Sequence, residues 1–250
     1  MRDELAGAAR DLAAYIKALD DTLVEAGRSR PAAEVSVPPR PQPSLPAVSG
    51  DMLALAEQVR TCRKCGLGAS RLNAVFGVGT YKARIVFVGE GPGFQEDHQG
   101  EPFVGRSGQL LDKIMETVLG LKRQDVYIAN IVKCHPMKNP ADPESRGNDR
   151  PPTPDEVAAC RPYLDAQLRF IRPACIVTLG SVPTKVLLST DKGISLMRGK
   201  WTSYQAGPSS EEPIRLMPTY HPAALLRNPN LKRDTWEDMK MVKSFLETVK

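Results

Sequence analysis

The chain has 250 residues, of which 41% are hydrophobic, 25% charged and 6% aromatic. This balance is typical of a globular protein and excludes a fibrous or wholly disordered chain. No apolar run reaches the roughly 18 to 20 residues of a membrane span, and the N-terminal segment carries acids and lacks the apolar core of a signal peptide. We therefore expect a cytoplasmic protein without membrane contact.

The net charge and the number of cysteines limit the classes of partner and the roles of the thiols. The net charge of +5 fits a polyanionic partner but is too modest to identify one. Five cysteines are an odd number, and in a chain without a secretion signal they indicate thiols, metal ligands or cluster ligands rather than a disulfide framework.

Two segments precede the expected folded domain. Residues 1–30 form an amphipathic helical extension, with apolar side chains at helical spacing before Gly27. Packing on its own domain or on a second copy is the simpler interpretation of this helix, and docking of a protein partner is the alternative. Residues 31–50 hold six prolines and no apolar period, which predicts an extended linker. The folded domain then spans residues 51–250.

Strands and helices alternate along this domain. Strands are predicted at 85–89, 126–132 and 175–180, and a last strand at 215–226 runs into a loop. Helices are predicted at 107–120, 153–171 and 235–250, the second capped by Thr153 with Glu156 three residues later. The order predicts an α/β fold with a parallel sheet flanked by helices.

Polar residues follow the strands, where ligands bind in such sheets. The sequence places GEGPG after the first strand, Asn130 in the second, a glycine turn after the third and Tyr-His-Pro after the last. The loop 89–112 is longer than a connection needs, which favours a functional role. This loop is neither a Walker loop nor a true GxGxxG fingerprint.

Four cysteines are candidates for a shared site: Cys62 and Cys65 in a CxxC, Cys134 after the second strand, and Cys160 in a helix. Their thiolates could hold zinc or an iron–sulfur cluster, and the spacing leaves both open. A redox CxxC is disfavoured because no strand precedes it. Cys175 lies inside an apolar strand, so we expect a buried hydrophobic residue there.

Two features lie near the end of the last strand. His221 is in a position suited to catalysis or ligand binding, with loop capping as the alternative. Leu225, Leu226 and Arg227 look like an exposed apolar pair beside a cation. In a core they would be ordinary, whereas in a nucleic-acid enzyme they would form a wedge that enters the base stack and a phosphate contact.

Five ordered motifs together resemble the family 4 uracil-DNA glycosylases, over roughly residues 51–250. They are the CxxC, GEGPGFQEDHQGEPFVGRSGQLLD, NIVKCHP, TPDEVAAC and HPAALLRNP. The resemblance implies a central four-stranded parallel sheet flanked by helices. It also implies base excision repair, in which uracil is flipped out of single- or double-stranded DNA and cleaved at its N-glycosidic bond, leaving an abasic site. A structural [4Fe-4S] cluster would be ligated by Cys62, Cys65, Cys134 and Cys160.

The resemblance also implies roles in binding the flipped base. Phe103 would stack on uracil, a contact worth about 1 to 3 kcal/mol. Asn130 would read the O4 and N3–H edge and reject cytosine, whose donor and acceptor are reversed. The backbone of Glu90, Gly91 and Pro92 would close over the base edge.

For catalysis, the resemblance implies that His221 donates a hydrogen bond to uracil O2. The mammalian-type uracil glycosylases carry an aspartate where this chain has Gly91. The resemblance therefore leaves Glu96 as the first candidate to position the attacking water, with Glu90 as the second. Leu225, Leu226 and Arg227 would contact DNA.

One departure and one competing interpretation stand beside this resemblance. The segment 135–152 is longer than the usual link between the last two cluster cysteines. We interpret Arg146 and Arg150 within it as solvated charges, with phosphate contacts as the alternative. The competing interpretation is a nucleic-acid-binding module, stabilised by zinc or a cluster, without catalysis. The joint presence of Phe103, Asn130 and His221 at separate strand ends favours the enzyme.

Overall fold

The computed structural model describes residue 17 and residues 50–206 and 212–249. The predicted extension 1–30, apart from the helical residue Lys17, and the predicted linker 31–50, apart from its last residue, lie outside the described residues. Within the described ranges, no helix has the length and apolar character needed to cross a bilayer.

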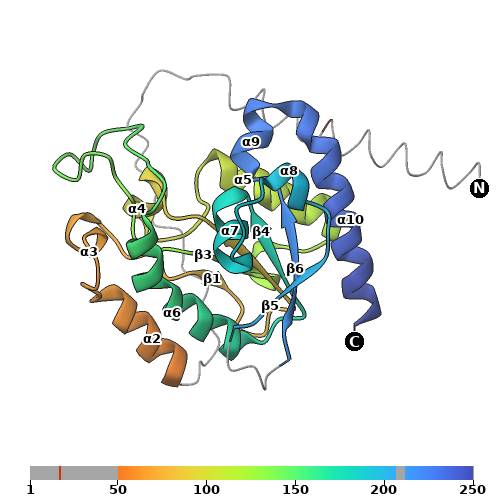
Figure 1. The fold of residues 1–250 in the computed structure, drawn as a ribbon, viewed down its shortest axis with the longest axis horizontal. Coiled ribbons are helices and arrows are strands. Elements are labelled where there is room, and N and C mark those ends of the chain that lie inside the picture. Colours follow the sequence, from red (N-terminus) through yellow and green to blue (C-terminus); the bar gives the residue numbers. More distant parts are fainter. Residues whose placement is uncertain (1–16, 18–49, 207–211, 250) are drawn as a thin grey trace, which may run out of the picture.

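A six-stranded sheet forms the centre of the molecule, in the order β1-β3-β2-β4-β6-β5 (Figure 1). The four central strands are parallel, as predicted. They are β3 (Tyr127–Asn130), β2 (Ile85–Gly89), β4 (Cys175–Leu179) and β6 (Ile214–Thr219). The edge strands β1 (Val78–Gly79) and β5 (Thr202–Tyr204) are antiparallel to their neighbours. The prediction of four strands missed both, because segments this short carry no readable alternation.

Helices cover both faces of the sheet (Figure 1). Alternate residues of β2 point to opposite sides: Ile85 and Phe87 join one core cluster, and Val86 and Val88 join the other. The first cluster includes α5 (Arg106–Ile114), the π-helix that continues it (Met115–Leu119), α9 (Pro222–Arg227) and α10 (Lys232–Thr248). The second includes α2 (Gly50–Arg60), α6 (Pro154–Ile171) and α7 (Ser181–Leu188). Shorter helices are α3 (Leu67–Ser70), α4 (Phe94–Gln99), α8 (Ile194–Met197) and the 3₁₀ turns Arg123–Asp125 and Pro229–Leu231.

The three predicted helices are confirmed. α6 begins as expected, with the Thr153 hydroxyl accepting from the Glu156 amide and the Glu156 carboxylate accepting from the Thr153 amide. The segment after β6 differs from the prediction, because it is the short helix α9 rather than a loop. His221 is its N-cap and Pro222 its first residue, a pair of signals that marks a helix start.

The carboxyl ends of the parallel strands meet at one edge of the sheet. Gly89 at the end of β2 pairs with Asn130 at the end of β3. The amide of Gly180, directly after β4, donates to the carbonyl of Thr219 in β6 over 2.9 Å. The residues that follow the strands are therefore brought together, as the parallel order requires.

Candidate active site

Phe103, Asn130 and His221 converge at this edge of the sheet. The rings of Phe103 and His221 lie with their centroids 5.6 Å apart. A Cβ placed on Gly89 would overlap Asn130 Oδ1 and come within 2.6 Å of Phe103 Cζ. Only a residue without a side chain fits between the amide and the aromatic ring, so Gly89 is part of the site's construction.

Asn130 has an unsatisfied acceptor in this site. Its side chain is buried, and its Oδ1 has no hydrogen-bond partner among the described residues. Buried polar atoms without a partner are rare in folded proteins, because desolvation without a compensating bond costs about 1 to 3 kcal/mol. Asn130 is therefore arranged to accept from a donor that the described chain does not supply.

The orientation of His221 follows from its place at the start of α9. Its Nδ1 accepts from the amide of Ala223 at 3.1 Å, so the proton of the neutral ring sits on Nε2. Desolvation, and secondarily the charge of Arg227, lower the pKa of His221 to about 4. The ring is therefore a neutral hydrogen-bond donor at neutral pH. Loop capping, the alternative interpretation, does occur through Nδ1, and it leaves the Nε2 proton for donation to a ligand.

Glu96 holds the loop that carries Phe103. Its Oε1 accepts from the amides of Val104 (3.0 Å) and Gly105 (3.2 Å), and its Oε2 accepts from the amide of Gly93 (3.2 Å). Phe103 itself adopts a left-handed backbone conformation with φ of 54°. Both carboxylate oxygens of Glu96 are thus engaged in fixing the backbone on either side of α4.

Glu90 differs from Glu96 in its surroundings. It directly follows β2, and its side chain is partly buried without a hydrogen-bond partner in the described part of the chain. Desolvation raises its pKa above the ordinary value. Next to it, Gly91 packs against Val132, since an added Cβ would lie 2.7 Å from Val132 Cγ2, and Pro92 is buried.

The three residues predicted to contact DNA are not equivalent. Leu225 is fully buried in the core cluster beneath α9, so the expectation that it is exposed is wrong. The short helix turns this side chain inward, an outcome that a loop prediction could not anticipate. Leu226 is only partly buried and Arg227 is exposed, so these two remain at the surface.

Four of the five cysteines line one pocket. Cys62, Cys65, Cys134 and Cys160 surround it together with apolar groups such as Val59 and Tyr163. The described residues contain no group of three or more Cys, His, Asp or Glu side chains placed to hold a single metal ion. Cys175 is buried in β4, as expected for a small hydrophobic residue.

Hydrogen-bond donors reach the sulfurs of this pocket. Arg71 Nη1 donates to Cys134 Sγ (2.9 Å), the Lys133 amide to Cys160 Sγ (3.3 Å) and the Lys64 amide to Cys62 Sγ (3.5 Å). Donors of this kind stabilise thiolates and tune clusters. An all-sulfur set in an apolar pocket fits an iron–sulfur cluster, which holds its thiolates further apart than a single ion does.

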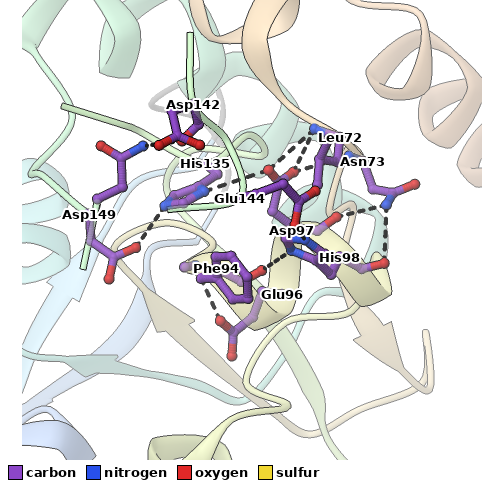
Figure 2. A network of polar contacts seen from close by, with 12 residues as sticks. Leu72, Asn73, Phe94, Glu96, Asp97, His98, His135, Asp142, Glu144 and Asp149 are labelled. Atoms are coloured by element: carbon purple, nitrogen blue, oxygen red, sulfur yellow. Dashed lines mark hydrogen bonds and ion pairs between the residues drawn. The ribbon is translucent and has the colours of Figure 1, made fainter. Parts of the chain in front are cut away.

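A polar network joins α4 to residues 72–73 and to the segment 135–152 (Figure 2). The buried Asp97 on α4 accepts from the amides of Leu72 and Asn73, and its Oδ2 lies 3.5 Å from Nδ1 of buried His135. Nε2 of His135 contacts Asp149 at 2.7 Å. Burial opposes a charge on this ring, but the hydrogen bond to Asp149 and the nearby carboxylate of Asp97 outweigh it and raise the pKa of His135 to about 9.

The two arginines of the segment 135–152 differ, because Arg150 is anchored to α6 and Arg146 is exposed. Arg150 forms a two-point pair with Glu156 at 2.7 and 2.8 Å and also donates to the Met137 carbonyl. The interpretation of Arg150 as a solvated charge is therefore wrong, because its guanidinium closes the segment onto α6. Arg146 is exposed and lies over the ring of Phe94, 5.9 Å from its centroid.

Sequence reasoning missed several residues of this region. The sequence marks Gly89 as the last residue of a strand and the first of the loop 89–112 but predicts no contact for it, although a glycine at a strand end can mark a close approach of side chains. Lys133 was not singled out, although a lysine directly after a buried apolar strand and before a cysteine is an unusual placement. The network of Asp97, His135 and Asp149 has no local signal, because its members are distant in sequence.

Comparisons with known proteins identify the family of this chain. The sequence model of the uracil DNA glycosylase superfamily matches residues 76–240. A type-4 uracil-DNA glycosylase of Sulfurisphaera tokodaii is 44% identical over 200 residues, which cover 78% of this chain and 85% of the relative. Those of Saccharolobus solfataricus and Thermotoga maritima are 42% and 41% identical, covering 78% of this chain and 86% and 95% of the relatives. The chain therefore belongs to the uracil DNA glycosylase superfamily and, within it, to the type-4 family.

Proposed function

We propose that the protein removes uracil from DNA by hydrolysing the N-glycosidic bond, as the first step of base excision repair. The observation that carries the proposal is the convergence of Phe103, Asn130 and His221 around Gly89. An aromatic face, a buried unpartnered amide oxygen and a neutral ring donor are what an extruded uracil requires. Residues 51–250 would form the catalytic domain.

Base recognition follows from the two polar edges of uracil. The unpartnered Asn130 Oδ1 accepts from N3–H, and its amide group donates to O4. Cytosine presents an acceptor at N3 and an amino group at position 4, so both contacts would be lost. Phe103 stacks on the base, and the backbone at Glu90, Gly91 and Pro92 covers its edge.

Catalysis stabilises the leaving base and supplies water. The bond from C1′ to N1 breaks with its electron pair on the base, and His221 Nε2–H donates to O2, where charge develops. We assign the water to Glu90 instead of Glu96, the first choice from the sequence, because no group in the described part of the chain bonds the Glu90 carboxylate. Glu90, whose pKa is raised, orients the water and takes its proton as oxygen bonds to C1′. Glu96 acts indirectly by holding the loop of Phe103.

The four pocket cysteines would hold a [4Fe-4S] cluster. When bound, the cluster links the segments after α2 and β3 to α6 and has no part in the chemical step. Leu226 and Arg227 would contact DNA beside the extruded base, as an apolar wedge and a phosphate partner.

The test is excision from an oligonucleotide that contains one uracil, followed by alkaline cleavage at the abasic site. We expect strand cleavage with uracil and none with cytosine at the same position. His221→Ala and Asn130→Ala should each lose most activity while they retain iron. An iron-loaded wild-type protein that binds the oligonucleotide without excising uracil would support the binding module instead.

A further inference from the structure

Lys133 is a fully buried lysine in the segment between Asn130 and Cys134. Lysine is almost never buried to this extent without an anionic partner. Its Nζ instead donates to two neutral oxygens, the main-chain carbonyl of Asn130 (2.9 Å) and Oε1 of Gln167 (2.7 Å). No carboxylate in the described ranges forms an ion pair with this ammonium group, and the ionisable groups that favour its charge are the thiols of Cys160 and Cys134. Burial of an ammonium group costs desolvation free energy, so packing alone does not explain why a lysine stands here.

The bond to Asn130 replaces one that the sheet does not provide. The edge strand β1 pairs only with Tyr127 and Ile128 of β3, so the ladder on that side stops before Asn130. A buried carbonyl needs a donor, and the Lys133 ammonium group supplies it. On the other side, the amide of Ile131 donates to the Gly89 carbonyl at 3.0 Å. Together these two bonds hold the single peptide unit that joins Asn130 to Ile131, one through its carbonyl and the other through its amide.

The other end of this short segment reaches the cysteines. The amide of Lys133 donates to Cys160 Sγ at 3.3 Å, and the next residue is Cys134. Gln167, which holds the ammonium group, lies two turns after Cys160 on α6. Its Nε2 is fixed in turn by the carbonyl of Phe76 and the hydroxyl of Tyr127, both at 2.9 Å. Lys133 thus contacts the cysteine pocket through its backbone and Asn130 through its side chain.

We propose that Lys133 is a positioning residue that ties the base-reading Asn130 to the cysteine-bearing segment and α6. The inference rests on the proposed function and adds a residue to it. The side-chain bond sets the place of Asn130, and the backbone bond sets the place of Lys133 relative to Cys160. Because reactive geometry tolerates little displacement, loss of the side-chain bond should slow excision without weakening the grip on DNA.

Lys133→Met is the first variant, because methionine keeps the unbranched shape and removes only the ammonium donor. Lys138→Met is its matched control, since Lys138 is exposed on the following segment 135–152, where its Nζ donates to the Gly147 carbonyl. We would compare iron content, visible absorption, the affinity for DNA with an abasic site, and the single-turnover rate of uracil excision. We expect unchanged iron and DNA affinity in both variants, with a rate about tenfold or more lower in Lys133→Met alone.

Lys133→Arg separates positioning from space filling. Arginine keeps hydrogen-bond donors but is bulkier, so a donor role predicts faster excision than in Lys133→Met, whereas space filling predicts the reverse. Wild-type excision by Lys133→Met, or equal losses of rate and DNA affinity, would overturn the proposal. If Lys133→Met does not fold, a folded Lys133→Arg decides: excision supports the proposal and inactivity overturns it. Failure of the wild-type protein to excise uracil would overturn the proposed function itself.

Discussion

The rings of Phe103 and His221 lie 5.6 Å apart at an inclination of 32°, although one belongs to the loop before α5 and the other begins α9. The aromatic face and the ring donor are therefore set at an angle to one another at the same edge of the sheet. In the proposed function, this arrangement offers stacking to the plane of a base and a hydrogen bond to its edge.

Replacing His221 by alanine tests the edge contact. We expect the single-turnover excision rate to fall about 10² to 10³-fold, because one donor to a developing negative charge is lost. Iron content and DNA affinity should stay at the wild-type level. His221→Gln, which can still donate, should retain more activity than His221→Ala. A fully active alanine variant would contradict the mechanism.

Gly89→Ala tests the close approach between β2 and the site. The added Cβ would overlap Asn130 Oδ1 and press on Phe103, so both must move. We expect loss of most excision activity and a decrease in the free energy of unfolding of about 1 to 3 kcal/mol, measured by urea titration. Gly193→Ala is the control, because its Cβ would meet open space at a negative φ. Equal effects at both positions would argue against a built contact.

The pH profile of excision should reflect the neutral state of His221. Its pKa in the fold is about 4, below the ordinary value of about 6.5. The ring therefore remains a neutral donor as pH falls through 6.5, and this group should place no inflection there. As pH falls, single-turnover rates should decline first with protonation of Glu90, whose pKa is raised, and the limb that belongs to His221 should lie lower, near pH 4. An inflection near 6.5 that disappears in His221→Gln would contradict this expectation.

The lowered pKa of His221 also makes the free energy of unfolding depend on pH. Because the folded state binds the proton less well than the unfolded chain, the contribution of His221 is complete above about pH 6.5 and declines as pH falls toward 4. Urea titrations of the wild-type protein and His221→Gln should therefore converge between these values. Parallel curves over this range would show that the ring titrates normally.

The cysteines should divide into two classes. Cys134→Ala should lose iron, visible absorption and excision together, because one ligand of the proposed cluster is removed. Cys175→Ala should keep all three, since this thiol is buried in β4 and is absent from the pocket. Iron analysis of the purified variants is the measurement. Retention of iron in Cys134→Ala would remove that residue from the ligand set.

Asp97→Asn tests the buried network on α4. The substitution keeps the size of the side chain but removes the charge that accepts from Leu72 and Asn73 and faces His135. We expect a loss of about 2 kcal/mol in the free energy of unfolding, from urea titration. Glu144→Gln removes a carboxylate from the exposed pair with His98 and should change little. Similar losses in both variants would contradict the distinction.

Much of this arrangement follows from the order of strands and helices. The apolar strands specify the parallel centre of the sheet, and parallel order alone brings Gly89, Asn130 and His221 to one edge. The inward turn of Leu225 and the buried state of Lys133 could not be predicted, because each depends on packing between distant segments. The role of Glu96 was also hidden, since its partners are backbone amides, which every residue but proline carries.

The backbone of Phe103 has a consequence for how the site meets its ligand. A non-glycine residue at φ of 54° is strained by about 1 to 3 kcal/mol, and the close packing of Gly108 against the Phe103 carbonyl leaves this turn little room to relax. The free energy of this strain is supplied by folding, before any base binds. The ring of Phe103, on which an incoming base would stack, is therefore already ordered, and the loss of conformational entropy on binding comes from the DNA rather than from the protein.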